Sequence, residues 1–162
     1  MWAHVWGFWS AVGFLVVAFG LIWVVVALSR SRRFAQARRD FHHQRERLEV
    51  KFVQLGLINT KSHTPRWTDC TFDDDVSYAR SRSTGELSAF VAVTIEMEGI
   101  DDILPRGGDA IGNLRAATAV FRFDGDRWET DGRAIFNLTP AEAIHFYQRD
   151  LEMVGQEVAA RP

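Results

Sequence analysis

The longest uninterrupted apolar stretch of the sequence lies near the N-terminus. Residues 5–28 carry no charged side chain, and Ser10 is the only hydroxyl-bearing residue among them. As an α-helix these residues would extend about 36 Å, which exceeds the roughly 30 Å hydrocarbon core of a bilayer. The pattern therefore predicts a single transmembrane helix over residues 1–28.

The charges that flank this stretch predict its orientation. No Lys or Arg precedes it, and a basic segment (residues 29–56) follows. Its first arginines are Arg30, Arg32, Arg33, Arg38 and Arg39. Basic residues beside a transmembrane helix stay on the cytoplasmic side and attract anionic lipid headgroups. We therefore expect an inner-membrane (plasma-membrane) protein with its N-terminus outside and its C-terminal domain in the cytoplasm. A cleaved signal peptide is the alternative, but it would have a positive n-region and a shorter apolar core.

A seven-residue repeat runs through the apolar stretch and beyond it. Small residues let membrane helices approach closely, and apolar residues at the same phase outside lipid bury against a partner. The expected helix-packing positions in the membrane are Ser10, Gly13, Val17, Gly20, Val24 and Ala27. The expected contact positions beyond it are Phe34, Phe41, Leu48 and Leu55. We predict one continuous helix ending near Leu55 with Gly56 as its C-cap. Its partner would be another transmembrane protein or a second copy, with docking on the chain's own domain as the alternative.

Strand patterns begin after a short linker, residues 57–66. Strands are expected over 67–72, 76–82, 86–98, 114–123 and 126–138, with an acidic turn at 73–75 and a mobile loop at 99–113. Gly85 in the loop between the second and third strands can take a positive φ. Asp124-Gly125 suits a two-residue type I′ turn, which would place Phe121 opposite Trp128.

The C-terminal part begins with a helix start signal. Thr139 at the N-cap, Pro140 at N1 and Glu142 at N3 form a capping box. The helix is expected to run to about Gly155 and to pack on the sheet. The predicted fold of residues 67–162 is thus α+β: a four- to five-stranded antiparallel meander with a C-terminal helix on it. Over about Leu48 to Val154 this architecture resembles cystatin-like or nuclear-transport-factor-like cone domains, many of which act as binding or assembly modules.

Charge and cysteine content narrow the function classes. The formal net charge is −2, but residues 29–66 hold ten Lys and Arg against three acids, and residues 67–162 hold nine Arg against eighteen acids. Such an acidic domain argues against nucleic-acid binding. Cys70 is the only cysteine, so no intrachain disulfide forms, which fits a reducing compartment.

Residues with catalytic or metal-binding chemistry do not form a recognisable motif. His42 and Glu46 are four residues apart, but no third ligand is spaced to join them. The aspartate-rich turns do not match the EF-hand pattern. We therefore expect no cofactor, no metal and no enzymatic activity.

One local feature is a candidate binding position. Gly132 lies inside an otherwise clear strand and predicts a bulge, which would re-aim Asp131 and Arg133. The simpler alternative is a bulge that only adds twist. The sequence as a whole predicts an accessory or scaffold subunit of a membrane complex, whose α+β domain mediates protein–protein contact. The alternative is a membrane-tethered ligand-binding or enzymatic domain with a pocket between the sheet and the C-terminal helix.

Overall fold

The computed structural model describes residues 3–59, 66–98 and 114–158, and within the first helix it describes the side chains of residues 18–58. The predicted loop at 99–113 and most of the predicted linker lie outside these residues. The chain divides into two compact units, residues 1–42 and 43–162. In chain order the elements are α1 (Ala3–Asn59), β1 (Arg66–Ser81), β2 (Leu87–Glu98), β3 (Leu114–Phe123), β4 (Trp128–Glu129), β5 (Ala134–Phe136), α2 (Pro140–Phe146) and β6 (Leu151–Glu157).

The transmembrane prediction is wrong. In the part of the chain that the structure describes, no helix has both the length and the apolar content that a membrane crossing requires. The apolar run of α1 ends at Leu28, after which serines and arginines alternate. The single-pass anchor, the inner-membrane location and the N-outside orientation are corrected accordingly.

The predicted end of the long helix is also wrong. Gly56 lies inside α1, which continues to Asn59. A Cβ atom built on Gly56 would lie 2.1 Å from a ring carbon of Trp67. The glycine therefore makes room for the Trp67 indole against the helix backbone, and it does not end the helix.

The described residues fold as α+β, with two helices and one antiparallel sheet of six strands. The strand order is β4-β3-β2-β1-β6, and β5 also pairs with β3. The count of six differs from the four to five expected because the first two predicted strands form one strand, β1, the last predicted strand is split into β4 and β5, and β6 was not predicted. The β1–β2 hairpin has the predicted loop, and Gly85 in it has a φ of +74°.

The acidic triplet 73–75 is a bulge within β1, and the predicted turn there is wrong. Phe72 pairs with Val93 and Val76 pairs with Val91, so three aspartates lie opposite the single residue Ala92. The strand therefore continues through the triplet as one element. A bulge of this kind bends the strand and redirects side chains.

The register of the β3–β4 hairpin differs from the prediction. Phe123, and not Phe121, pairs with Trp128. The turn holds four residues, 124–127, closed by the Asp124 N–H donating to the Arg127 carbonyl at 3.0 Å. The two-residue shift keeps Phe121 and Trp128 on the same face, because side chains alternate with a period of two.

The C-terminal helix is much shorter than expected. The capping box at Thr139 and Glu142 is confirmed, but α2 ends at Phe146 and residues 151–157 form β6. β6 pairs antiparallel with residues 76–81 of β1. This pairing satisfies backbone groups of β1 that a longer helix would have left open.

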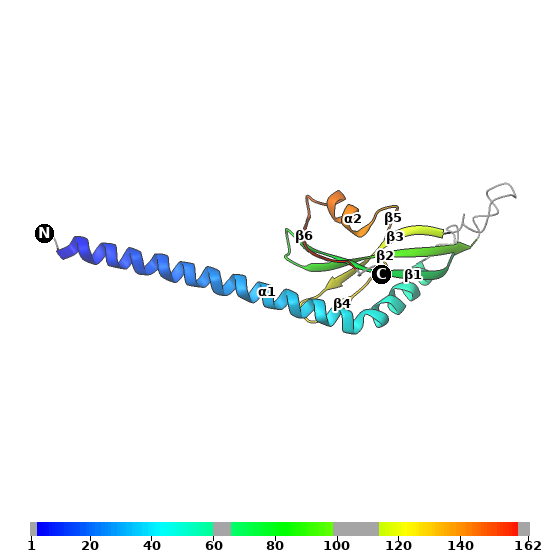
Figure 1. The fold of residues 1–162 in the computed structure, drawn as a ribbon, viewed down its shortest axis with the longest axis horizontal. Helices are drawn as coiled ribbons and strands as arrows, with labels where there is room; N and C mark the ends of the chain where they lie inside the picture. The colour runs from blue at the N-terminus through cyan, green and yellow to red at the C-terminus, as the bar shows by residue number, and fades with distance from the viewer. Residues whose placement is uncertain (1–2, 60–65, 99–113, 159–162) are drawn as a thin grey trace. The chain divides into compact units, whose positions relative to one another are not determined.

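The two faces of the sheet are covered by different helices, which Figure 1 shows on opposite sides. On one face Phe52 of α1 packs against the rings of Trp67, Phe72 and Phe121 at centroid distances of 5.6, 5.7 and 6.0 Å. On the other face α2 closes a second core. That core consists of Ala79, Phe90, Val120, Ala143 and Ile144, with Ile135, Leu138 and Leu151 partly buried around it.

Candidate functional site

The first unit exposes a continuous apolar surface on α1. Between residues 19 and 28, eight large apolar side chains are each 44–67 % exposed. They are Phe19, Leu21, Ile22, Trp23, Val24, Val25, Val26 and Leu28. Because these residues are nearly consecutive, the helix is apolar on every side. We call residues 18–28 the apolar segment.

The small residues predicted for helix packing lie in or before this segment. Gly20, Val24 and Ala27 are exposed, and a Cβ built on Gly20 would meet nothing within 4 Å. The side chains of Ser10, Gly13 and Val17 lie outside the described ones. Close packing through these six positions therefore stays a prediction.

The predicted contact positions further along α1 have different surroundings. Phe34 is partly exposed, and the Arg38 guanidinium lies 5.7 Å from the centre of its ring. Phe41 is fully buried and meets the His42 ring edge-on at 6.0 Å. Leu48 is buried within the second unit, and Leu55 lies directly against Gly132. Leu55 thus contacts the chain's own α+β domain. Docking on this domain was the alternative to a contact with another protein or a second copy.

The predicted headgroup arginines follow the apolar segment. Arg30, Arg32, Arg33 and Arg39 are exposed on α1, whereas Arg38 is half-buried beside Phe34. They give this part of the helix a dense positive charge. An anionic partner for them is still a prediction.

The predicted bulge at Asp131, Gly132 and Arg133 joins β4 to β5. Gly132 has a φ of +74°, and a Cβ on it would lie 2.7 Å from the Cβ of Leu55. The Asp131 carboxylate accepts from the Arg122 guanidinium and, at 3.2 Å, from the Arg133 backbone N–H. The Arg133 guanidinium lies 5.9 Å from the centre of the Tyr147 ring. Each polar side chain thus has a partner within the fold, and the close approach of Gly132 to α1 explains the bulge structurally.

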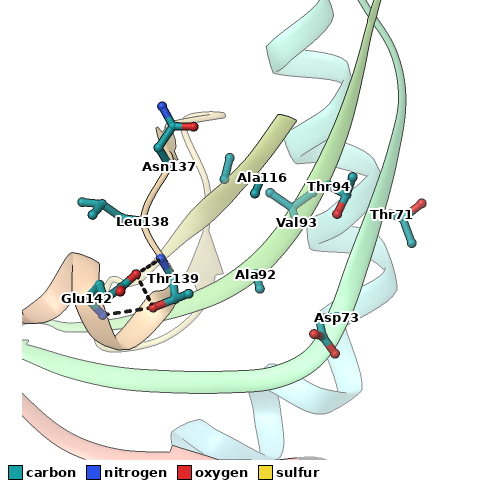
Figure 2. Close-up of a pocket in the computed structure, with 11 residues that line it drawn as sticks. Thr71, Asp73, Ala92, Val93, Thr94, Ala116, Asn137, Leu138, Thr139 and Glu142 are labelled. Carbon is teal, nitrogen blue, oxygen red and sulfur yellow. Dashed lines mark hydrogen bonds between the residues drawn. The ribbon is translucent and has the colours of Figure 1, made fainter. Parts of the chain in front are cut away.

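An open hollow of about 430 Å³ lies on the α2 face of the sheet. Figure 2 shows its residues as sticks: Ala92, Thr94 and Ala116 belong to the sheet, with Asp73 on one side and Glu142 on the other. It is lined by Thr71, Asp73, Ala92, Val93, Thr94, Ala116, Ala117, Asn137, Leu138, Thr139 and Glu142.

The β1 side of the hollow is fixed by the bulge and by Arg45 of α1. The Arg45 guanidinium donates to the backbone carbonyl of Asp73 and lies 3.5 Å from the Asp74 carboxylate. Its Nε also pairs with Glu49 at 2.6 Å. Arg45 therefore braces the bulge from the helix side, where it holds Asp74, while Asp73 lines the hollow.

The α2 side of the hollow is fixed by the capping box. One Glu142 carboxylate oxygen accepts from the Thr139 backbone N–H at 2.9 Å and from the Thr139 hydroxyl at 2.8 Å. The backbone hydrogen bond, and then the hydroxyl bond, hold the pKa of Glu142 below its usual value. Nearby, Asn137 adopts a φ of +60° and donates its backbone N–H to the Ala116 carbonyl at 3.0 Å.

The lone cysteine faces a second hollow, of about 480 Å³, between α1 and β1. Burial, and secondarily the charge of Asp69, raise the pKa of Cys70 to about 11. Because the thiolate is the nucleophilic form, Cys70 is unreactive at neutral pH. Among the described residues, no group of three His, Cys, Asp or Glu side chains converges on a metal position.

No protein-family model, curated protein or solved structure matches this chain. No match therefore supports the resemblance to cone-like domains.

Sequence reasoning identified Asp73 and Glu142 only as parts of a turn and a cap. Arg45 was not among the predicted site residues. The hollow between them depends on the β1 bulge, and a bulge needs the register of two strands to be known. The capping box was the one local signal that pointed to this place.

Proposed function

We propose that this protein is an accessory or scaffold subunit that works by protein–protein contact, with a partner protein enclosing the apolar segment of α1. The observation that carries the proposal is the exposure of eight large apolar side chains on all sides of one helix. A helix that is apolar all round is normally buried, and large exposed apolar patches mark interaction sites.

The free energy available at this surface is large enough to drive association. Fully burying one large apolar side chain contributes about 1.5–3 kcal/mol. Eight side chains, each about half exposed, would contribute about 6–12 kcal/mol when covered. Immobilising two molecules costs about 4–15 kcal/mol, so association requires that most of the eight are covered together. A groove that touched one stripe would not suffice, so the partner should surround the segment with several elements.

The arginines that follow the segment indicate the partner's charge. Arg30, Arg32 and Arg33 are exposed directly after the last apolar residue. Acidic residues at the matching edge of the partner would speed association and fix its direction along the helix. The α+β domain would then be held at a defined place in the complex.

Site-specific photo-cross-linking tests this proposal. A benzophenone amino acid is placed at Leu21, Ile22 or Trp23, consecutive positions about 100° apart around the helix, and the cells are irradiated. The matched control carries it at Gln36, an exposed polar position on the same helix. We expect all three apolar positions to give an adduct with one and the same protein, and Gln36 to give little of it.

Three results would overturn the proposal: adducts with lipid alone, adducts at one side of the helix only, or equal yields at Gln36 and the apolar positions. Mass spectrometry of the adducts distinguishes these cases. The enzymatic alternative depends on the hollow beside α2, whose carboxylates at Asp73 and Glu142 are exposed and not buried as acid–base catalysis favours.

A further inference from the structure

The hollow on the α2 face has the size and lining of a small binding site. Its volume of about 430 Å³ lies within the range of 300–1,000 Å³ common for small-molecule sites. Its floor is made of small side chains, Ala92, Thr94 and Ala116, so no large side chain fills it. Thr71 and Thr139 also line the hollow.

The charged side chains that line the hollow are all acidic. The hollow is lined by two carboxylates, Asp73 and Glu142, and none of its described lining residues is Lys, Arg or His. The two acids belong to separate elements, the β1 bulge and α2, and each is held by contacts of its own. Arg45 stays on the opposite side of β1, where it pairs with Asp74 and Glu49.

We propose that this hollow binds a small organic cation, an ammonium or guanidinium group, with Asp73 and Glu142 as its two anionic partners. The ligand's apolar chain would lie over Ala92 and Ala116, and the threonine hydroxyls would accept further hydrogen bonds. This inference is independent of the contact proposed for α1.

The carboxylates are suited to this role. The Asp73 carboxylate accepts the Asp74 backbone N–H at 2.7 Å, which orients it without neutralising it. In the capping box the Thr139 N–H and hydroxyl both bond the same Glu142 oxygen, so the other oxygen can accept from a ligand. The lowered pKa of Glu142 keeps that group ionised at neutral pH.

The same cation could be a free amine or the side chain of a lysine or arginine on another protein. Both present a charged head on a flexible apolar chain. The test therefore uses both kinds of probe: 1,4-diaminobutane and agmatine for a free amine, and N-acetyl-lysine methylamide for a protein side chain. Butane-1,4-diol has the shape of the first probe without its charge and serves as the neutral control.

Titration calorimetry of the full chain, kept dispersed in a non-ionic detergent, measures binding of each probe. We expect at least one cationic probe to bind and the diol not to bind. Asp73→Asn and Glu142→Gln should each weaken binding about fivefold, as expected for one partly exposed charge pair. Gln can still accept at N3, so Glu142→Gln retains the capping box. Ala92→Leu should abolish binding by filling the floor without changing charge.

Asp126→Asn and Glu152→Gln are the matched controls. Both remove an exposed carboxylate that does not line the hollow, so binding should stay within about twofold of the unchanged chain, as expected for screened charges. If these controls weaken binding as much as Asp73→Asn does, the effect is general charge screening and the proposal is wrong. It is equally wrong if the diol binds as well as the diamine, or if no cationic probe binds at up to about 10 mM. Binding of the free amines alone, or of the lysine derivative alone, supports the proposal and identifies the source of the ligand.

Discussion

The two faces of the sheet are built from the same strands but finished in different ways. On the α1 face, large rings fill the space beneath the helix, and Phe52, Tyr78 and Phe121 are fully buried. On the α2 face, the seven-residue α2 covers only part of the sheet, and small side chains lie beside it in an open hollow. We therefore expect the α1 face to contribute more of the stability, while the α2 face has a smaller core beside its open hollow.

Four glycines of the second unit differ in the space around them. Gly56 and Gly132 have no space for a Cβ because Trp67 and Leu55 press against them. Gly85 and Gly125 also have positive φ, but space around them is open. Among these four glycines, a close approach by a neighbour is thus found only at Gly56 and Gly132, where α1 meets the rest of the second unit.

The largest expected effect is the loss of a ring from the α1 face. Phe52→Ala should lower the free energy of unfolding of the domain by about 3–5 kcal/mol, because it removes a fully buried ring that contacts three others. Phe146→Ala, at the end of α2, is the control: its ring is 69 % exposed. We expect it to change stability by less than about 0.5 kcal/mol. Guanidinium unfolding followed by tryptophan fluorescence measures both.

If Phe52→Ala does not fold, Phe52→Leu keeps the comparison measurable, since a hydrophobic swap of similar volume costs less than about 1.5 kcal/mol. Equal losses at Phe52 and Phe146 would show that the α2 face carries as much of the stability as the α1 face.

A smaller effect is expected where the bulge meets α1. Gly132→Ala should cost about 2–3 kcal/mol, because alanine disfavours a φ of +74° and its Cβ would lie 2.7 Å from that of Leu55. Gly125→Ala has a similar φ without a neighbour and should cost about 1 kcal/mol. The same unfolding experiment gives both values. If the two substitutions cost the same, the close approach to Leu55 contributes nothing.

Local signals in the sequence predicted those parts of the fold that depend on neighbouring residues. The capping box at Thr139 and the positive φ of Gly85 follow from side-chain chemistry within a few positions, and both are confirmed. The pairing of β6 with β1 joins residues seventy or more positions apart, whereas the spacing of Ile144, Tyr147 and Leu151 is typical of a helix. Tertiary pairing overrode the local pattern there.

The candidate sites were less predictable than the fold. The apolar segment was visible in the sequence, but among the described residues no helix meets the length and apolar content of the predicted membrane span. The hollow needs the β1 bulge, and Asp73–Asp75 reads as a turn unless the pairing of Phe72 and Val76 with β2 is known. Arg45 acts on the bulge from 28 residues away, which no local pattern indicates.

An intermediate effect is expected at the start of α2. Thr139→Ala should cost about 1 kcal/mol at pH 7, since it removes the N-cap hydroxyl that bonds both the Glu142 backbone N–H and the Glu142 carboxylate. The folded pKa of Glu142 lies below its ordinary value of 4.5, so its contribution is complete above that value and is lost as the pH falls through the folded pKa. The cost of Thr139→Ala should therefore shrink below pH 4.5.

Glu142→Gln is the control for this pH dependence. The glutamine does not titrate but can still accept a hydrogen bond at N3. The difference in free energy of unfolding between this variant and the unchanged chain should therefore vary with pH only below about 4.5. Unfolding curves at several pH values between about 3 and 7 measure it. A cost of Thr139→Ala that is constant over this range would contradict the role given to the charged capping box.

The smallest expected effect is at the outer side of the bulge. Asp131→Asn weakens an ion pair with Arg122 whose side chains are about half exposed, and the amide oxygen can still accept the Arg133 backbone N–H. Exposed ion pairs contribute little, so the loss should be below about 0.5 kcal/mol.

Thr130→Val, one residue earlier, is the contrasting substitution. The Thr130 hydroxyl is buried; it donates to the Val120 carbonyl and accepts the Gly132 N–H, both at 3.1 Å. Leaving those two backbone groups unsatisfied should cost about 1–3 kcal/mol. Chemical unfolding of the two variants side by side measures both losses in free energy of unfolding. If Asp131→Asn costs as much as Thr130→Val, stability is not concentrated in the packed interior. The difference proposed between the two faces of the sheet is then wrong.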